Sequence, residues 1–323
     1  MIRFPSLSSF PTLLTAAAAT SLCLASAQER ILAVTGEPAP GAPFGADFSM
    51  LGSRPVINEF GSVVFGGEVR VGLDPRSGIW QTSGSFIRLI SLDGDPGPDP
   101  GTTFSGSPQH LGVSDLGAVA FLSGFVSSSG FFGTSLFLGG DALLRALVSV
   151  GDPAPGAASG VTFRTLQSPR IDLFGDTTFL ATLEGPGINA SNQDGIWRGS
   201  ESGLQLVARE GDNAPDLPLA IRFDELTLPA IDRFGRVAFG ASVTGPGVVP
   251  QGNDYGMWRE RSAGALELLA RAGDSAPGFI PQVVFRSSNV TSPLFRPLIN
   301  DNRRVAFMAD ITGPTLFLSL IHI

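Results

Sequence analysis

The stretch Gly151-Asp152-Pro153-Ala154-Pro155-Gly156 decides the fold, because close copies of it return along the whole chain. The other copies begin at Gly36, Gly94, Gly211 and Gly273, and the steps between leading glycines are 58, 57, 60 and 62 residues. Self-similarity at a near-constant period is the signature of a repeat architecture, in which each copy is one supersecondary unit. We therefore expect repeats at about residues 31–93, 94–150, 151–210, 211–272 and 273–323, with the last one incomplete.

A second motif keeps the same period and predicts a tight hairpin in every repeat. Its first copy is Asn58-Glu59-Phe60-Gly61, followed directly by the apolar run Ser62-Val63-Val64-Phe65. In such a turn the short polar side chain hydrogen-bonds the backbone that follows it, and the glycine adopts a positive φ. The motif residues are Asn58, Gly61, Phe65, Gly117, Phe121, Asp172, Gly175, Phe179, Asp232, Gly235, Phe239, Asn300 and Phe307.

Arg303 stands where the last copy of this hairpin would have its glycine. We expect a strained or remodelled turn there. In a remodelled turn Asn302 would take the left-handed conformation, which asparagine adopts more readily than most residues. A third motif, Gly-Ile-Trp or Gly-Met-Trp, contains all the tryptophans of the chain, which are Trp80, Trp197 and Trp258. These tryptophans are expected to pack between neighbouring sheets rather than to form a platform for sugar rings.

Each repeat is predicted to form four short strands. In the third repeat they cover about Phe163–Ile171, Thr177–Leu183, Gly195–Arg198 and Leu204–Arg209. The second strand of most repeats is apolar on both faces, as in Ala118-Val119-Ala120-Phe121-Leu122, so both faces must be covered.

The first strand of four repeats carries a proline, which belongs at a sheet edge. These prolines are Pro55, Pro169, Pro229 and Pro297. Stacked four-stranded sheets with such an edge facing a common axis predict an all-β, β-propeller-like array of antiparallel blades. Four blades are complete and the fifth is partial or composite.

The two ends of the chain depart from the repeat. Arg3, the apolar run to Leu24 and Ala25-Ser26-Ala27 predict a signal peptide over 1–27, with a single propeller domain over 28–323. The apolar run is well short of the roughly 20 residues that a membrane-spanning helix needs. Ile31–Thr35 resembles an orphan fourth strand that could close the ring against Leu316–Leu320. The alternative, which we favour, is a truncated last blade with partial or absent pairing of these ends.

Charge and cysteine content narrow the function classes. The only cysteine is Cys23, and removal of residues 1–27 with Arg3 changes the formal net charge from −8 to −9. All 21 basic residues are arginine. Such an acidic chain is a poor candidate for binding nucleic acid or anionic membranes. We expect a monomer that is secreted or displayed at the cell surface, with an extracellular ligand or surface component as its partner.

The hairpin motif resembles the Asn-x-x-Gly-x-x-Ala-Phe pattern of the bacterial tandem-repeat family of "choice-of-anchor" proteins. The resemblance covers nearly all of residues 31–310. It departs at Val64 and Thr178, which replace alanine, and at Arg303, which replaces glycine. The resemblance implies an exported bacterial surface protein with a variable C-terminal anchor and implies no particular activity. No anchor follows in this sequence.

Residues that could carry chemistry are sparse, and none is assigned a catalytic or cofactor-binding role. His110 occupies a variable repeat position held elsewhere by Arg54, Ser168, Leu228 and Arg296, and general base chemistry needs an oriented partner. The repeated acids Glu37, Asp95, Asp152, Asp212 and Asp274 raise a calcium hypothesis, with the last four as weak candidates. Each acid stands nearly alone, whereas Ca²⁺ takes 6–8 oxygens, so turn capping is the favoured role. No other cofactor is expected.

Two function hypotheses remain. The favoured one is a binding or structural module whose loops, such as Asn189–Asp194 and Gln251–Asp254, contact a ligand. The alternative is an extracellular hydrolase or lyase that acts on polysaccharide through an Asp/Glu pair about 5–10 Å apart. The sequence offers no acid that stands out from the repeat, so an enzyme is the less favoured interpretation.

Overall fold

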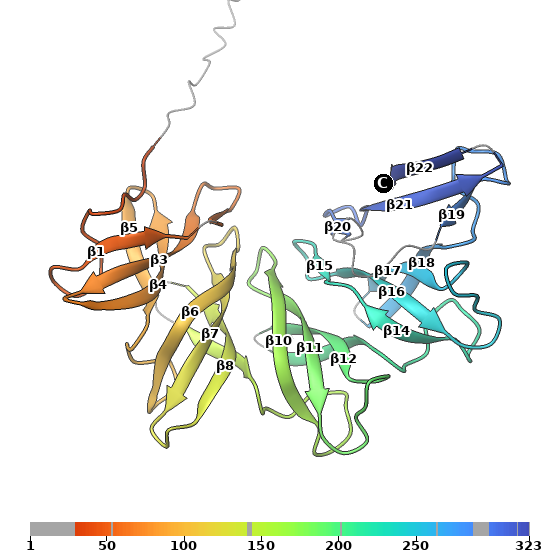
Figure 1. The fold of residues 1–323 in the computed structure, drawn as a ribbon. Coiled ribbons are helices and arrows are strands. Elements are labelled where there is room, and N and C mark those ends of the chain that lie inside the picture. Colours follow the sequence, from red (N-terminus) through yellow and green to blue (C-terminus); the bar gives the residue numbers. More distant parts are fainter. Residues whose placement is uncertain are drawn as a thin grey trace, which may run out of the picture. The chain divides into compact units, whose positions relative to one another are not determined.

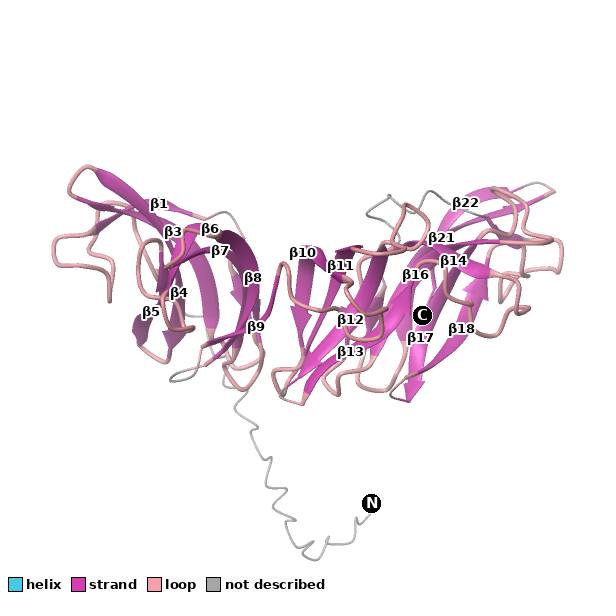
Figure 2. Cartoon of the chain, turned by 90° about the horizontal axis from the view of Figure 1, so that it is seen from below, coloured by secondary structure: helices cyan, strands magenta, loops and turns pink. Residues whose placement is uncertain are grey.

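The computed structural model describes residues 30–52, 54–140, 144–200, 202–262, 264–286, 297–314 and 316–322. The predicted signal peptide, with Cys23, lies outside these residues. Ala33–Ile323 forms one compact unit. Every regular element in the described ranges is a β-strand, as Figure 2 shows. This part of the chain accordingly contains no helix with the length and apolar character needed to cross a membrane.

The strands form five antiparallel sheets in chain order (Figure 1). The first contains β1 (Asp47–Leu51), β2 (Val56–Ile57), β3 (Val63–Val71), β4 (Asp74–Ser83) and β5 (Phe86–Leu92). The second contains β6 (Thr102–Val113), β7 (Val119–Ser127), β8 (Phe132–Gly139) and β9 (Arg145–Ser149). The third contains β10 (Thr162–Ile171), β11 (Thr177–Glu184), β12 (Asp194–Ser200) and β13 (Gly203–Arg209). The predicted strands of the third repeat are therefore confirmed to within one or two residues.

The last two sheets follow the same plan. The fourth contains β14 (Arg222–Leu226), β15 (Ala230–Ile231), β16 (Val237–Thr244), β17 (Tyr255–Ser262) and β18 (Ala265–Arg271). The fifth contains β19 (Val284–Arg286), β20 (Leu298–Ile299), β21 (Val305–Gly313) and β22 (Leu316–His322). The second and third sheets are meanders in which every strand pairs with the next along the chain. In the first and fourth sheets the first strand consists of two pieces, which both pair with the strand that follows them. The fold is all-β, a β-propeller-like array of four-stranded antiparallel blades.

The prolines lie on the first, edge strand of their sheets, as predicted. In the first and fourth sheets this strand is divided into two pieces, β1 with β2 and β14 with β15, and Pro55 and Pro229 lie between the pieces. Pro169 lies within β10 where the register with β11 shifts between Gln167 and Arg170. A proline lacks the N–H that a ladder needs, so the pairing is interrupted at these positions.

The second strands are buried on both faces because each sheet packs against the next. Val119 and Phe121 of β7 share a core with Val64 of the first sheet. Ala120 and Leu122, on the opposite face of β7, share a core with residues of the third sheet. The second strands lack alternating polar residues because both of their faces are covered by neighbouring sheets, as expected.

A repeated aromatic cluster forms the centre of each blade. In the third sheet, Trp197 lies edge-on to Phe163 with ring centroids 4.9 Å apart, and it stacks on Phe179 at 6.4 Å. Its indole Nε1 donates a hydrogen bond of 3.0 Å to the carbonyl oxygen of Pro155. Trp80 and Trp258 make the same bond to Pro40 and Pro215. The proline-containing segment that precedes a blade is thereby fixed to that blade's third strand.

The hairpin turns have the geometry that the motif requires. Gly61, Gly117, Gly175 and Gly235 have φ between 77° and 96°. In the last turn the expectation for Asn302 is wrong, because Arg303 itself takes the left-handed position with φ of 62°. The Asn300 side chain holds this turn through hydrogen bonds from the backbone N–H of Asn302 and Arg304. Because the Asn300 side chain fixes the backbone of the turn, the fourth turn residue is left-handed here as in the other blades, although it is an arginine and not a glycine.

Replacing Gly235 by Val is expected to lower the free energy of unfolding by about 1–3 kcal/mol, because a β-branched residue is strained at positive φ. The reverse change, Arg303→Gly, should raise it by roughly 0.5–1 kcal/mol by relieving strain at the equivalent position. Chemical denaturation of residues 28–323 measures both values. Equal effects of the same sign would contradict the turn assignment.

The chain ends do not pair as a closed ring would require. β22 pairs antiparallel with β21, which places it in the third-strand position of the fifth sheet. Residues 31–35 lie outside every strand of the described ranges. For residues 33–35, which belong to the same compact unit as β22, the prediction that this terminal pairing would be partial or absent is confirmed.

Candidate functional site

The site begins with the five hairpin turns, whose first residue caps the turn from its side chain. Asp172 Oδ1 accepts the N–H of Phe174 and of Asp176, both at 2.8 Å. Asn58, Asp232 and Asn300 accept the equivalent pairs of N–H groups, and Ser114 accepts one through its hydroxyl. The five turns are therefore built alike, and they differ in the side chains that they present.

The second turn residues of four blades meet one another. Arg233 of the fourth blade lies 3.1 Å from Asp301 of the fifth blade, through its Nε. Its guanidinium also lies 3.8 Å from Asp115 and 3.8 Å from Glu59, in the second and first blades. One arginine therefore contacts acidic side chains from three other blades. In Figure 1 the labels β15 and β20 mark the strands that lead into the turns of Arg233 and Asp301. Each of these partly exposed ion pairs adds little to the free energy of unfolding. Their shared arginine nevertheless links the turns of four blades.

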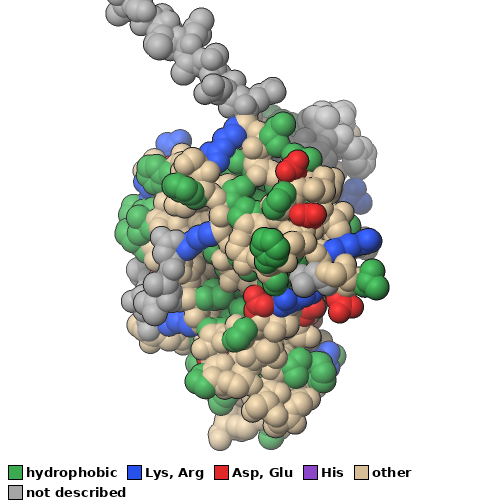
Figure 3. All heavy atoms as spheres, turned by 90° about the vertical axis from the view of Figure 1, so that its left-hand side faces the viewer, with side chains coloured by type: hydrophobic (Ala, Val, Ile, Leu, Met, Phe, Trp, Pro, Cys, Tyr) green, Lys and Arg blue, Asp and Glu red, His purple; other side chains and the backbone are tan. Residues whose placement is uncertain are grey.

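The third turn residue presents an apolar side chain to solvent in four of the five blades. The exposed fractions are 78% for Phe60, 69% for Leu116, 62% for Phe174 and 55% for Phe234. Other exposed apolar side chains are scattered; on the side of the first sheet they lie among arginine and acidic side chains (Figure 3). The turn residues recur at one repeat position in four blades, whereas Phe44 and Leu219 share another position in two blades.

A polar pocket of about 380 Å³ lies beside one of these exposed rings. Its walls are the hairpin that joins β12 to β13, the turn that contains Phe234, and Asp176. The lining residues are Asp176, Arg198, Ser200, Ser202, Gly203, Leu204, Gln205, Phe234 and Gly235. The pocket therefore lies between the third and fourth sheets, and its size falls in the range of small-molecule sites.

Arg198 organises this pocket. Its Nη1 donates to the Gly235 carbonyl oxygen and to Glu260, both at 3.0 Å. Its Nη2 donates to Gln205 Oε1 at 2.5 Å. Gln81 makes the equivalent bond to Gly117 between the first and second blades, and Arg259 makes it to Arg303 between the fourth and fifth. The third strand of one blade thus fixes the turn of the next.

Asp172, below the pocket, is an acid whose surroundings disfavour its charge. Burial and, to a smaller extent, the nearby Asp176 carboxylate raise the pKa of Asp172 to about 6, against the backbone hydrogen bonds that lower it. In the next blade the equivalent Asp232 pairs with Arg236 at 2.5 Å, whereas Asp176 occupies the position of Arg236 in the third blade. The same turn therefore has a compensated carboxylate in one blade and an uncompensated one in the other.

Asp172→Asn is expected to raise the free energy of unfolding at pH 7 by about 1–3 kcal/mol, because a folded-state pKa near 6 disfavours the ionised form. The amide oxygen can keep the turn, as it does at Asn58. Below about pH 4 the Asp172 carboxyl is protonated in both the folded and the unfolded state. The stability gain of Asp172→Asn therefore appears only as the pH rises from about 4 to about 6.

Asp232→Asn is the matched control and should lower the free energy of unfolding at pH 7, because Arg236 loses its partner. Urea denaturation from pH 4 to 7 checks both, and equal effects would contradict the assignment.

A second acidic pair lies at the end of β13. Burial raises the pKa of Glu210 to about 7, and Glu210 Oε2 accepts the backbone N–H of Asp194 at 3.0 Å. Asp194, Asp224 and Glu225 raise the same pKa through their charges. The expectation that no acid stands out from the repeat is wrong, because Glu210 and Asp176 have no acidic equivalent in most blades. Neither Glu210 nor Asp194 lines the polar pocket.

The sequence-predicted candidates lie in separate blades and are not brought together. Asp95 pairs with Arg76 at 2.5 Å, Asp212 pairs with Arg209 at 3.1 Å, and Asp152 accepts the N–H of Ser149. Asp274 begins the fifth blade through its backbone, which accepts the N–H of Phe285. Within the described ranges, no three His, Cys, Asp or Glu side chains are grouped so that they could hold a metal ion.

His110 lies in a strand, and the acid-amide loops have mainly local contacts. His110 lies in β6 with φ of 55°, and Ser168 at the equivalent position has φ of 47°. The Asn192 side chain donates to the Gly187 carbonyl oxygen and accepts the N–H of Asn189. Asn253 forms the corresponding bonds in the next blade. These amides therefore close their own loops.

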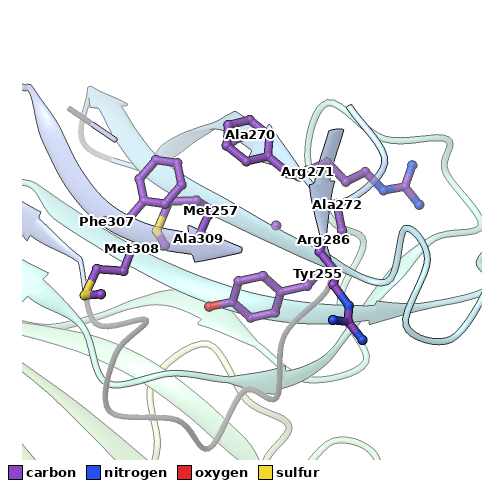
Figure 4. Close-up of a pocket in the computed structure, with 11 residues that line it drawn as sticks. Tyr255, Met257, Ala270, Arg271, Ala272, Arg286, Phe307, Met308 and Ala309 are labelled. Atoms are coloured by element: carbon purple, nitrogen blue, oxygen red, sulfur yellow. The ribbon is translucent and has the colours of Figure 1, made fainter. Parts of the chain in front are cut away.

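A smaller cleft separates the fourth and fifth sheets (Figure 4). It is lined by Tyr255, Met257, Phe307 and Met308 among others, with Arg271 and Arg286 at one side. Its volume is about 20 Å³, which is close to what one water molecule needs. This cleft is a packing gap, so the polar pocket beside Phe234 is the stronger candidate site.

The repeated blades and their shared turn define a β-propeller-like repeat protein. The chain belongs to the family described as "Family of unknown function (DUF7453)", whose model matches residues 25–249 and 219–319. No curated protein matches the sequence.

Among solved structures, the Hadza microbial sialidase Hz136 is similar with a TM-score of 0.36 and 12% identity, over 84% of this chain and 58% of that one. The chain thus spans less than two thirds of that sialidase. The α-L-arabinanase of Penicillium chrysogenum gives a TM-score of 0.33 at 10% identity, over 84% and 77% of the two chains. Similarity at this level carries no conclusion about activity.

Proposed function

We propose that this protein is an exported or cell-surface binding module that takes a small ligand, or one unit of a larger one, in the pocket between the third and fourth sheets. The observation that carries the proposal is the pocket of about 380 Å³, in which a half-exposed aromatic ring lies beside amide, hydroxyl and carboxylate groups. An apolar surface with a few convergent polar groups is the usual composition of a ligand site. The predicted signal peptide supports export.

The proposal is tested by closing the pocket. Ser202 is exposed at its rim, so Ser202→Trp should fill the space without disturbing the sheets. Ser85→Trp, in the equivalent hairpin of the first blade, is the matched control. A library of sugars, amino acids, organic acids and amines is screened against residues 28–323 by saturation-transfer NMR. Compounds that bind the wild type and Ser85→Trp but not Ser202→Trp support the function, and a screen without such compounds contradicts it.

One observation favours polysaccharide hydrolysis as a second candidate. Burial raises the pKa of Asp172 to about 6. Asp172 and Asp176 are close together, because each has a carboxylate oxygen 3.5 Å from the position that a Cβ atom would take on Gly235. Two neighbouring carboxyl groups, one of which has a raised pKa, are an arrangement used by glycoside hydrolases. However, Asp172 is buried and its Oδ1 is engaged by the turn. Release of reducing ends from polysaccharide by the wild type, and its loss in Asp172→Asn, would place hydrolysis ahead of binding alone.

A further inference from the structure

The chemistry of the pocket restricts its ligand. This inference rests on the proposed function and adds the ligand class. We propose that the pocket binds a neutral saccharide, with one face of a sugar ring on Phe234 and with its hydroxyl groups bonded to Gln205, Asp176 and the serines of the β12–β13 hairpin.

The charges around the pocket disfavour an acidic ligand. Arg198 is committed to Glu260, Gly235 and Gln205, so its positive charge already has a buried partner. An acidic ligand would therefore meet no uncompensated cation, and it would face Asp176. A cationic ligand would meet the guanidinium of Arg236, which lies 5.2 Å from the centroid of the Phe234 ring. A cationic ligand would, however, also meet the carboxylate of Asp176, so an amine probe must be compared with neutral ligands.

The polar groups match hydroxyl chemistry. Gln205 accepts Arg198 through Oε1, which leaves its Nε2 as the group that can donate to a ligand. The carboxylate of Asp176 can accept several hydrogen bonds, including those of adjacent hydroxyls. Ser200 and Ser202 share one hydrogen bond of 2.6 Å between their hydroxyls, so one of their protons can turn towards a ligand. Donors and acceptors thus alternate along one wall, as a hydroxylated ring requires.

Phe234 supplies the apolar surface on the other side. Phe234 is 55% exposed and borders the pocket. The C–H face of a sugar ring is apolar and can pack on an aromatic ring, whereas its hydroxyl edge needs polar partners. A ligand with both characters in one ring fits the pocket better than an apolar or a fully polar molecule.

This combination occurs at one blade interface among those described. The cross-strand pairs at the position of Arg198 and Gln205 are Gln81 with Arg88, Leu138 with Arg145, and Arg259 with Glu267. The residues at the position of Asp176 are Ser62, Ala118, Arg236 and Arg304. The third blade alone joins an acid, a glutamine and a following aromatic turn residue, which is the departure from the repeat that a specific site needs.

The three tryptophans make a direct test available. Trp80, Trp197 and Trp258 are fully buried, so Phe234→Trp adds one exposed fluorophore at the pocket. Phe174→Trp adds one at the equivalent turn of the neighbouring blade, where it does not line the pocket. Both variants of residues 28–323 are titrated with a panel of neutral mono- to trisaccharides of the common hexoses and pentoses, with trigalacturonic acid, and with a glucosamine trimer.

We expect at least one neutral saccharide to change the emission of Phe234→Trp saturably and to leave Phe174→Trp unchanged. Adding Gln205→Ala to Phe234→Trp should weaken that binding at least about tenfold, while unchanged melting temperatures show that both variants fold. A response to the acidic or amine probe alone overturns the ligand class and leaves the binding function standing. An equal response of both fluorophores also overturns it. If no probe responds and the pocket-closure screen is also negative, the binding function fails with it.

Discussion

Trp197→Ala is expected to lower the free energy of unfolding by about 3–5 kcal/mol, because it empties the centre of a blade. The side chain is fully buried among Phe163, Phe179 and the core shared with the second sheet. Truncation of such a side chain removes its burial energy and leaves a cavity. It also leaves the Pro155 carbonyl oxygen without its indole donor. Urea denaturation followed by circular dichroism measures the loss.

The second blade provides a natural comparison for this change. Phe137 occupies the tryptophan position there. Its ring centroid lies 5.1 Å from that of Phe104 and 5.3 Å from that of Phe121. Ser135 stands where the tryptophan-containing blades have glycine. In the third blade, a Cβ at Gly195 would lie 2.6 Å from the Trp197 indole, so glycine accompanies tryptophan for lack of space.

This comparison predicts a non-additive pair. Gly195→Ser alone should be strongly destabilising, and Trp197→Phe alone should cost about 1–3 kcal/mol. The double variant reproduces the second blade, so its loss should be smaller than the sum of the single losses by at least about 1 kcal/mol. Additive losses would show that Gly195 is required for another reason.

The repeat made the blades predictable, since the same turn motifs flank the strands in each copy. The proline positions and the apolar second strands indicated edge strands and stacked sheets, because both patterns depend only on local backbone chemistry. The hairpin glycines were predictable for the same reason. Arg303 was not, because the choice between it and Asn302 depends on the side-chain cap from Asn300.

The candidate site was not predictable from the motifs. Asp176, Gln205 and Phe234 belong to three segments that come together only when the third and fourth sheets pack. The sequence nevertheless indicated unusual positions. Asp176 replaces an uncharged or basic residue of the other blades, and Glu210 replaces an uncharged residue or an aspartate. In a repeat protein, departures from the consensus identify candidate sites better than the consensus does, because the consensus encodes packing.

Arg198→Gln is expected to lower the free energy of unfolding at pH 7 by about 3 kcal/mol or more, because it leaves Glu260 as a buried charge without its partner. The exposed fraction of the Glu260 side chain is 1%, and that of Arg198 is 13%. Burial raises the pKa of Glu260, and the Arg198 guanidinium opposes that shift. Without the arginine, the ionised form of Glu260 becomes less favourable still. The loss in Arg198→Gln should therefore shrink as the pH falls and Glu260 becomes protonated.

A second substitution drawn from the repeat should restore stability. Thr82 occupies the position of Glu260 in the first blade, where its hydroxyl accepts the N–H of Val63 at 2.7 Å. Glu260 accepts the equivalent N–H of Val237 at 3.0 Å. Glu260→Thr thus removes the charge and keeps an acceptor, while Gln at position 198 can reach Gly235 as Gln81 reaches Gly117. The double variant Arg198→Gln with Glu260→Thr should be within about 1 kcal/mol of the wild type and should lack the pH dependence of Arg198→Gln. A double variant as unstable as Arg198→Gln would show that the arginine acts through its bonds to Gly235 and Gln205 and not through the ion pair.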